Sequence, residues 1–259
     1  MQYAVVVLSL GALVAAQDFK SLSQACQNGV TAVQSNAEAN SCINVSGLLS
    51  LLVVPADQSL ITPVNNWLTA FCGADDCSSE TIQAVVANVS TACATDFESL
   101  GVTQDQINTV LPYIQDNFGA AKQIICLADT TQDEFCVTEL ANNLQTFLGA
   151  PLTLNTLKSN ANLQSAEGVP TNITCVPCTQ AALVKLKDTQ LSTVVDLSSA
   201  VGTECGADFS SATTSPSNII VGTGSNVPKG QNGDGSASPL AVAGSLSALA
   251  GILAAAFLA

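Results

Sequence analysis

The residues best suited to chemistry in this 259-residue chain are two cysteines three positions apart, in the segment Cys-Val-Pro-Cys from Cys175 to Cys178. An apolar-periodic stretch, Thr179 to Lys187, follows directly, so the second thiol is expected at a helix N-terminus. The positive end of a helix dipole lowers the pKa of a thiol, and such a pair suits thiol–disulfide exchange. Thiol oxidoreduction through Cys175 and Cys178 is therefore one hypothesis for the function.

The cysteine count favours structural disulfides over a redox pair. Ten cysteines form an even set, which is typical of a secreted protein that joins all of them in five bridges. No strand–helix–strand pattern of the thioredoxin-like kind surrounds the close pair. Oxidation of the thiols competes with zinc binding, so we expect no metal site. The cysteines expected in disulfides are Cys26, Cys42, Cys72, Cys77, Cys93, Cys126, Cys136, Cys175, Cys178 and Cys205.

These cysteines fall into two sets of five with similar spacing. Each set runs as single, single, close pair, single, and the sets end alike, in CATDF from Cys93 and CGADF from Cys205. We interpret this pattern as a degenerate tandem repeat. An odd number in each set requires at least one bridge between the sets, which predicts one body. The pairing itself stays open, because ten thiols allow on the order of 945 combinations.

Residues that are missing restrict other catalytic chemistry. The chain has no His and no Arg, and its six basic residues are all Lys, against 20 acidic residues. Without His there is no Ser-His-Asp or Cys-His nucleophile and no imidazole ligand for a metal. The net charge of -14 disfavours nucleic acid as a partner. We assign no catalytic residue and no cofactor, and expect a protein that is not an enzyme.

Pairs of carboxylates are the remaining route to catalysis, since two acids suffice for glycoside hydrolysis or an aspartic protease. The pairs Asp75-Asp76 and Asp133-Glu134 precede apolar-periodic segments, where acids complement a helix N-terminus, so helix capping is the preferred interpretation. Asp129-Thr130-Thr131 and Asp188-Thr189-Gln190 lack the glycine of an aspartic-protease loop.

Helical periodicity dominates the elements that must position these residues. Apolar residues recur at helical spacing after Ser79, after a capping box at Thr103, and from Asp133 to a stop at Gly149. Pro112 should bend or divide the second of these helices. Further helices are expected at Leu22–Gln34, Val45–Val53, Pro63–Phe71, Leu152–Leu163, Thr179–Lys187 and Leu191–Val201. The expected fold class is all-α, a disulfide-stapled helical bundle built from two degenerate five-cysteine modules.

Three side chains that could bind a ligand have structural interpretations. Lys185 and Lys187 share one helix, and we interpret them as a solvated face. Trp67 stands at helical spacing with Phe71 and is predicted to be part of the core.

The two ends of the sequence predict secretion and a lipid anchor. Residues 1–16 have the apolar core and small terminal residues of a cleaved signal peptide. Residues 239–259 are expected to be the apolar tail of a glycosylphosphatidylinositol (GPI) attachment signal, with Asn232 preferred over Gly235 as the attachment residue. The predicted location is extracellular, on the plasma membrane, in the cell wall, or both.

Between these ends we expect three regions. A first helical cysteine-rich module covers residues 17–125 and a second covers 126–209. A flexible stalk rich in Ser, Thr, Gly and Pro follows at 210–238. N-linked glycans are expected where sequons are exposed, and the candidate residues are Asn44, Asn88 and Asn172.

Four motifs extend over nearly the whole mature chain: WLTAFC from Trp67, CLADTTQDEFCVTE from Cys126, TCVPCTQAA from Thr174 and CGADF from Cys205. Together they resemble a family of uncharacterised fungal secreted proteins that are cysteine-rich and GPI-anchored. The resemblance implies a fungal cell-surface setting and carries over no catalytic residue. In part, the spacing of the third to fifth cysteines is also similar to that of elicitins, small helical proteins that bind sterols, but the second five-cysteine set does not map onto them.

Three hypotheses for function follow. The first is a non-enzymatic structural or adhesive protein, held by a GPI lipid and in contact with an unidentified cell-wall or surface partner. The second is a carrier that holds an apolar small molecule, a sterol or fatty acid, between amphipathic helices. The third is the thiol oxidoreductase that uses Cys175 and Cys178. We prefer the first.

Overall fold

The structure, a computed structural model, describes residues 22–51, 54–99, 103–159, 169–189 and 197–228. The expected signal peptide, the attachment residues Asn232 and Gly235 and the apolar tail lie outside this part of the chain. None of the helices in the described ranges is both long and apolar enough to cross a membrane.

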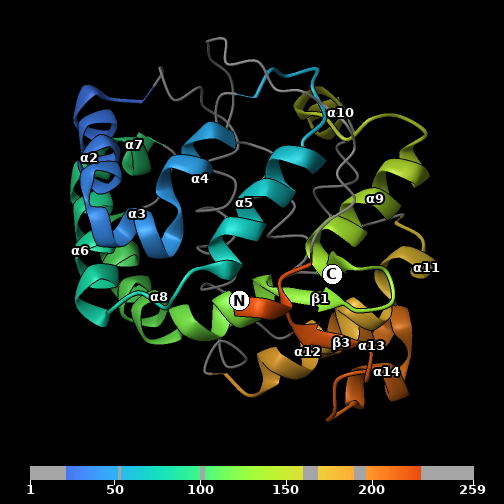
Figure 1. The fold of residues 1–259 in the computed structure, drawn as a ribbon. Helices are drawn as coiled ribbons and strands as arrows, with labels where there is room; N and C mark the ends of the chain where they lie inside the picture. Colours follow the sequence, from blue (N-terminus) through green and yellow to red (C-terminus); the bar gives the residue numbers. More distant parts are fainter. Residues whose placement is uncertain (1–21, 52–53, 100–102, 160–168, 190–196, 229–259) are drawn as a thin grey trace.

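The described chain is mostly helical, which confirms the all-α prediction (Figure 1). The first half consists of α2 (Gln24–Ser35), α3 (Ala37–Ile43), α4 (Val45–Leu51), α5 (Ile61–Gly73), α6 (Ser79–Ala92), α7 (Ala94–Ser99) and α8 (Gln104–Ile125). The second half begins with a hairpin of β1 (Leu127–Asp129) and β2 (Glu134–Phe135). It continues with α9 (Cys136–Leu148), α10 (Leu154–Ser159), α11 (Thr171–Thr174), α12 (Pro177–Lys187), α13 (Leu197–Cys205), α14 (Ala207–Ser211), β3 (Ile219–Val221) and the 3-10 helix η4 (Gly224–Asn226).

Most of the expected helices form close to their predicted bounds. A serine caps α6, because the Ser78 hydroxyl accepts a hydrogen bond from Thr81 N, and Gly149 ends α9 in the left-handed conformation. Pro112 does not divide its helix, since α8 continues through this residue, and the bend that the sequence allowed instead stays a prediction.

A small three-stranded sheet is the feature that helical periodicity did not predict. Its order is β2-β1-β3 with antiparallel pairs, and Ala128 is opposite Phe135 on one side and Ile220 on the other. The sequence predicted that Asp133 and Glu134 cap a helix, and this prediction is wrong. Asp133 makes the hairpin turn with a φ of 52°, Glu134 lies in β2, and α9 starts only at Cys136.

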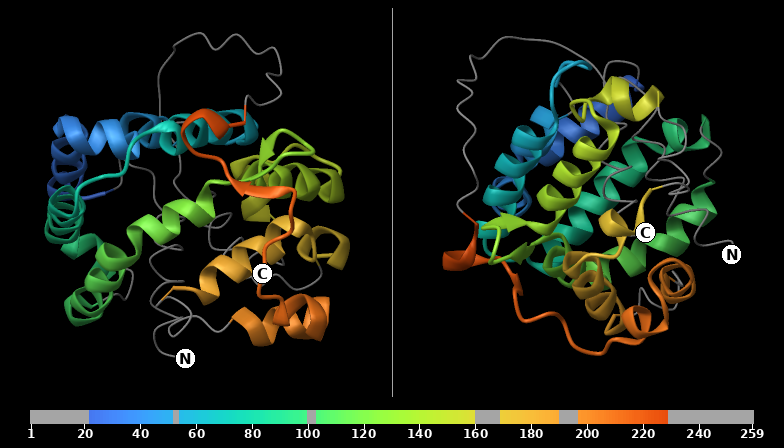
Figure 2. Two further views of the ribbon diagram at one scale, coloured as in Figure 1. Left: turned by 60° about the horizontal axis from the view of Figure 1, so that its bottom comes forward. Right: turned by 90° about the vertical axis from the view of Figure 1, so that its right-hand side faces the viewer.

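The predicted stalk begins too early in the sequence. Residues 212–228 continue the folded body, and β3 pairs with β1 along its whole length. The backbone N of Gly222 donates to the carbonyl of Cys126 at 2.7 Å, and Val227 packs against the main core. The residues around this strand have the composition of a linker, which explains the wrong prediction. The segment folds because Ile219, Ile220 and Val221 supply apolar surface. The views in Figure 2 show the segment crossing the surface before the described chain ends.

One core connects the two halves of the sequence. Trp67 and Phe71 of α5 belong to the same buried cluster as Phe135 and Leu154 of the second half. The rings of Trp67 and Phe71 stack with centroids 4.9 Å apart, and Trp67 is 6% exposed, which confirms its predicted place in the core. The predicted module boundary at 125/126 thus lies between α8 and β1, inside a continuous body.

All ten cysteines form disulfides, as expected. The pairs are Cys26–Cys93, Cys42–Cys77, Cys72–Cys126, Cys136–Cys178 and Cys175–Cys205. The third of these is the bridge between the two sets that their odd number requires. Only the pairing of second with fourth cysteine occurs in both sets, so the repeat in spacing is not a repeat in connectivity.

Candidate functional site

Three carboxylates gather beside the Cys136–Cys178 bridge, at the junction of the hairpin with α9. Asp129 ends β1, Glu134 opens β2, and Glu139 lies in the first turn of α9. The hairpin positions the first two, because Asp129 and Glu134 are direct partners in the β1–β2 register. We call the group of Asp129, Glu134, Glu139 and the disulfide the acid–disulfide site.

Glu139 has the most perturbed environment in this site. Its carboxyl Oε2 lies 3.0 Å from Cys178 Sγ. Burial first, and then the negative charges of Asp129 and Glu134, raise the pKa of Glu139 to about 7. Near neutral pH this carboxyl is therefore about half protonated, whereas an exposed glutamate would be ionised.

Asp129 is 4% exposed, yet it remains ionised. Burial acts to raise its pKa, but hydrogen bonds outweigh that effect and lower it. The carboxylate accepts from Thr131 N and Thr131 Oγ1, both at 2.6 Å, and from Asn218 Nδ2 at 3.0 Å. The two donors of Thr131 lie within the hairpin turn, and the donor of Asn218 joins the hairpin to the segment before β3. Asp129 therefore has a structural role and supplies the negative charge that favours the protonated form of Glu139.

Glu134 lies between these two extremes. Burial raises its pKa, a hydrogen bond from Asn142 Nδ2 at 3.0 Å acts against that rise, and the charge of Asp129 adds to it. The donor comes from α9, so Glu134 joins β2 to that helix.

Two carboxyl groups with opposite pKa shifts are the usual sign of acid–base chemistry. Here the two groups are not equivalent partners for a substrate, because the oxygens of Asp129 are occupied by donors of its own fold. The group that can give up a proton is Glu139, and the atom next to it is a disulfide sulfur. The chemistry that this arrangement can support is therefore proton transfer to sulfur.

The ligand atoms of Cys136, Glu139 and Cys178 lie within 4.8 Å of one another, close enough to hold a metal ion. In this structure both sulfurs belong to one disulfide, and the thiolates that zinc prefers are absent. The expectation of no metal site thus stays a prediction for the oxidised protein.

The close pair Cys175 and Cys178, singled out by the sequence, does not form a bridge of its own. Cys178 is joined to Cys136 and is 1% exposed, whereas Cys175 is joined to Cys205 and both of these cysteines are partly exposed. Cys178 does lie at a helix N-terminus, as expected, because it is the second residue of α12.

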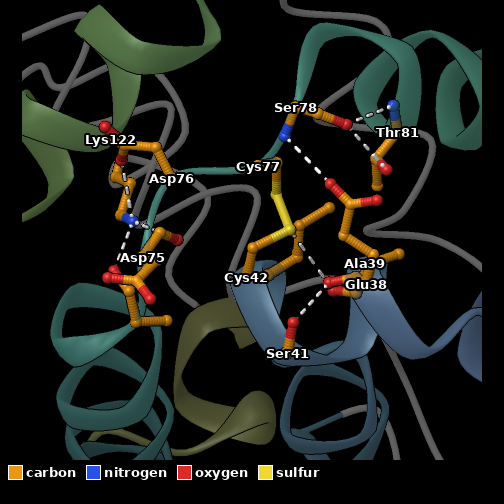
Figure 3. Close-up of a disulfide and its surroundings, with 12 residues drawn as sticks. Glu38, Ala39, Ser41, Cys42, Asp75, Asp76, Cys77, Ser78, Thr81 and Lys122 are labelled. Carbon is orange, nitrogen blue, oxygen red and sulfur yellow. Dashed lines mark hydrogen bonds and ion pairs between the residues drawn. A yellow bond between two sulfur atoms is a disulfide. The ribbon is translucent and has the colours of Figure 1, made fainter.

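The other predicted candidates have structural roles. Ser78, and not Asp76, is the N-cap of α6. Asp76 instead pairs with Lys122, because its Oδ1 lies 3.0 Å from the Lys122 ammonium, and the Lys122 side chain is 4% exposed. Lys122 also donates to the carbonyls of Ala74 and Asp75 (Figure 3). Lys187 was expected to be solvated, but its ammonium donates to the carbonyls at 210 and 212, at the end of α14.

The three sequons differ in exposure. Asn88 on α6 and Asn172 on α11 are exposed. Asn44 is half-buried, ends α3 with a φ of 54°, and accepts a hydrogen bond from Gly47 N at 3.2 Å. A glycan is therefore better accommodated at the first two positions.

Glu139 is the functional candidate that the sequence analysis missed. One signal was available, because Glu139 follows Cys136 by three residues and so shares its helix face. The place of Cys178 in this site could not be predicted from spacing, because Cys178 lies 42 residues after Cys136 and only the disulfide pairing brings the two together.

No family model, no curated protein and no solved structure matches this chain.

Proposed function

We propose that this protein is a secreted helical ectodomain, held at the cell surface by a GPI lipid, with a structural or adhesive role and no enzymatic turnover. The observation that carries the proposal is the use of all ten cysteines in five disulfides within one body. Such complete oxidation indicates an oxidising, extracellular compartment. Each bridge joins cysteines that are at least 30 residues apart in the sequence.

The end of the described chain supports a short tether. The described part of the folded body includes Pro228, and the preferred attachment residue Asn232 follows four residues later in the sequence. Four residues span at most about 14 Å when fully extended. A lipid at Asn232 would therefore hold the body close to the membrane, without the long stalk that the composition suggests.

The setting that fits this proposal is a fungal surface, which the motifs around Trp67, Cys126 and Cys205 support through their resemblance to cysteine-rich fungal proteins. A structural or adhesive role accords with the lack of His and Arg, which removes the commonest nucleophile and phosphate-binding systems.

The test begins with the full-length protein expressed in fungal cells. A phosphatidylinositol-specific lipase should release it, or digestion of the wall polysaccharide should do so if it has been transferred there. An Asn232→Gln variant with Gly235 intact should be secreted without the lipid. Release of the parent protein by neither treatment would contradict surface anchoring.

The released protein then separates adhesion from ligand carriage. Native and denatured masses should agree, and the protein should bind intact cells or isolated walls. Extra mass that is lost on denaturation and matches a sterol or fatty acid would make it a carrier instead.

A further inference from the structure

The Cys136–Cys178 bridge is the one disulfide of the five that joins two helix N-termini. Cys136 is the first residue of α9, which has 13 residues, and Cys178 is the second residue of α12, which has 11. Each of the other four bridges includes a cysteine at the C-terminal end of a helix, namely Cys42, Cys72, Cys93 and Cys205. A thiolate is stabilised at a helix N-terminus, so reduction of this bridge leaves both sulfurs in favourable positions.

A proton donor is already in contact with one of these sulfurs. Cys178 Sγ has no hydrogen, because the atom is part of a disulfide. At the 3.0 Å separation, the hydrogen bond to Glu139 Oε2 therefore forms when the carboxyl O–H donates to the sulfur. The neighbouring charges of Asp129 and Glu134 favour this protonated form.

We propose that Cys136–Cys178 is an exchangeable disulfide, in which an external thiolate attacks Cys136 and Glu139 protonates the departing sulfur of Cys178. The attack forms a mixed disulfide on Cys136 and breaks the original S–S bond. The bonding electron pair moves to Cys178 Sγ, which takes the proton from Glu139 and becomes a thiol, while Glu139 becomes a carboxylate. A second molecule of the same monothiol then resolves the mixed disulfide, leaving Cys136 reduced and the external thiol oxidised.

The direction of attack follows from exposure and from the position of the proton. Both residues are buried, but Cys136 is 5% exposed and Cys178 is 1% exposed, so Cys136 is the residue nearer to solvent. Departure of a thiolate is faster when it is stabilised or protonated, and Cys178 has both the α12 N-terminus and the Glu139 carboxyl beside it. Exchange at this bridge is stoichiometric and independent of the proposed surface anchor.

The experiment uses the intact, folded protein and reduced glutathione as the monothiol. Samples are taken across pH 6 to 8, alkylated and mapped by mass spectrometry, and each rate is divided by the glutathione thiolate concentration. The mixed disulfide should appear on Cys136. Its thiolate-corrected rate should fall about tenfold from pH 6 to pH 8, because the protonated fraction of a carboxyl with a pKa of about 7 falls by that factor.

A matched pair of variants tests the role of Glu139. Glu139→Gln keeps a hydrogen-bond donor for the sulfur but has no proton to transfer, so its corrected rate should be independent of pH and at least about a hundredfold lower than that of the parent at pH 6. Glu38→Gln, beside the Cys42–Cys77 bridge, should leave the exchange at Cys136 unchanged. The partly exposed Cys175–Cys205 bridge provides an internal reference in every sample.

Three results would overturn the proposal. In the first, the Cys136–Cys178 bridge stays intact while another disulfide of the folded protein exchanges. In the second, the mixed disulfide forms on Cys178. In the third, the corrected rate of Glu139→Gln depends on pH in the same way as that of the parent. If Glu139→Gln does not fold, the pH profile of the parent alone decides, because a pH-independent corrected rate excludes Glu139 as the acid.

Discussion

The second-to-fourth bridges of the two cysteine sets, Cys42–Cys77 and Cys136–Cys178, each have a glutamate on the helix of their first cysteine. Glu38 precedes Cys42 by four residues in α3, and Glu139 follows Cys136 by three in α9. The two carboxyl groups have opposite properties. Hydrogen bonds from Thr81 and Ser78 lower the pKa of Glu38, whereas burial and two neighbouring acids raise that of Glu139 to about 7.

The neighbours of each carboxyl explain this difference. Glu38 faces the N-terminus of α6 and accepts a hydrogen bond from Ser78 N at 3.2 Å (Figure 3). Glu139 faces a hairpin that presents Asp129 and Glu134. A helix start supplies unpaired N–H donors, while this hairpin supplies negative charge. A glutamate one helical turn from a bridged cysteine is therefore a fixed carboxylate in one half and a proton donor in the other.

Removal of each bridge should have the largest effect on stability. Cys42→Ala with Cys77→Ala and Cys136→Ala with Cys178→Ala should each lower the free energy of unfolding by about 4 kcal/mol, because the two loops have similar lengths, 35 and 42 residues. Denaturant titration at pH 5 measures both double variants. A loss confined to one of them would show that the two bridges do not constrain the chain alike.

A close helix contact in the first half has no equivalent among the described glycines of the second half. A Cβ at Gly29 would lie 2.3 Å from Ala92 Cβ, where α2 crosses α6, whereas a Cβ at Gly202 would lie 3.0 Å from the movable hydroxyl of Ser210. Gly29→Ala should therefore lower the free energy of unfolding by about 1–3 kcal/mol through overpacking. Gly202→Ala is the matched control and should be neutral or slightly stabilising. Equal effects in denaturant titrations would contradict this difference.

Glu139 should make the protein less stable as pH rises. Below pH about 4.5 the carboxyl is protonated in both the folded and unfolded states. Between about 4.5 and 7 the unfolded chain releases this proton and the folded state retains it, so the free energy of unfolding falls. The group is only half-buried, so we expect a contribution of about 1–2 kcal/mol, smaller than the pKa shift alone implies.

The measurement for this effect is denaturant unfolding at pH 4.5 and pH 8. Glu139→Gln should remove the contribution and make the variant more stable than the parent at pH 8. A variant with the same pH dependence as the parent would assign the effect to other groups.

Glu38 should have the smallest effect and the opposite dependence on pH. Glu38→Ala removes the acceptor for Ser78 N at the start of α6 and should lower the thermal midpoint slightly at pH 7. The pKa of Glu38 is lowered in the folded state, so its contribution is present above the ordinary glutamate pKa and is lost as pH falls through the folded value. Thermal unfolding of parent and variant should converge in acid. A gap that widens in acid would be evidence against the carboxylate role.

The sequence predicted the local features of this protein well. Apolar spacing located most of the helices, and Trp67 at helical spacing was assigned correctly to the core. The predictions from the sequence were wrong where a short segment gains its structure from a partner elsewhere in the chain. Residues 219–221 are a short apolar run in a segment of linker-like composition and form a strand only by pairing with β1. Asp133 and Glu134 resemble a helix cap in the sequence, but they lie in the β1–β2 hairpin.

The sequence by itself determined the helical class, the even number of cysteines and the need for a bridge between the two sets, because periodicity and parity are properties of the chain alone. Tertiary structure decided which cysteines pair, and it placed Cys178 and Asp129 around Glu139. A carboxyl pKa depends on the charges, donors and burial within a few ångströms. For Glu139 those neighbours come from β1, β2 and α12, and only the folded chain brings these elements together.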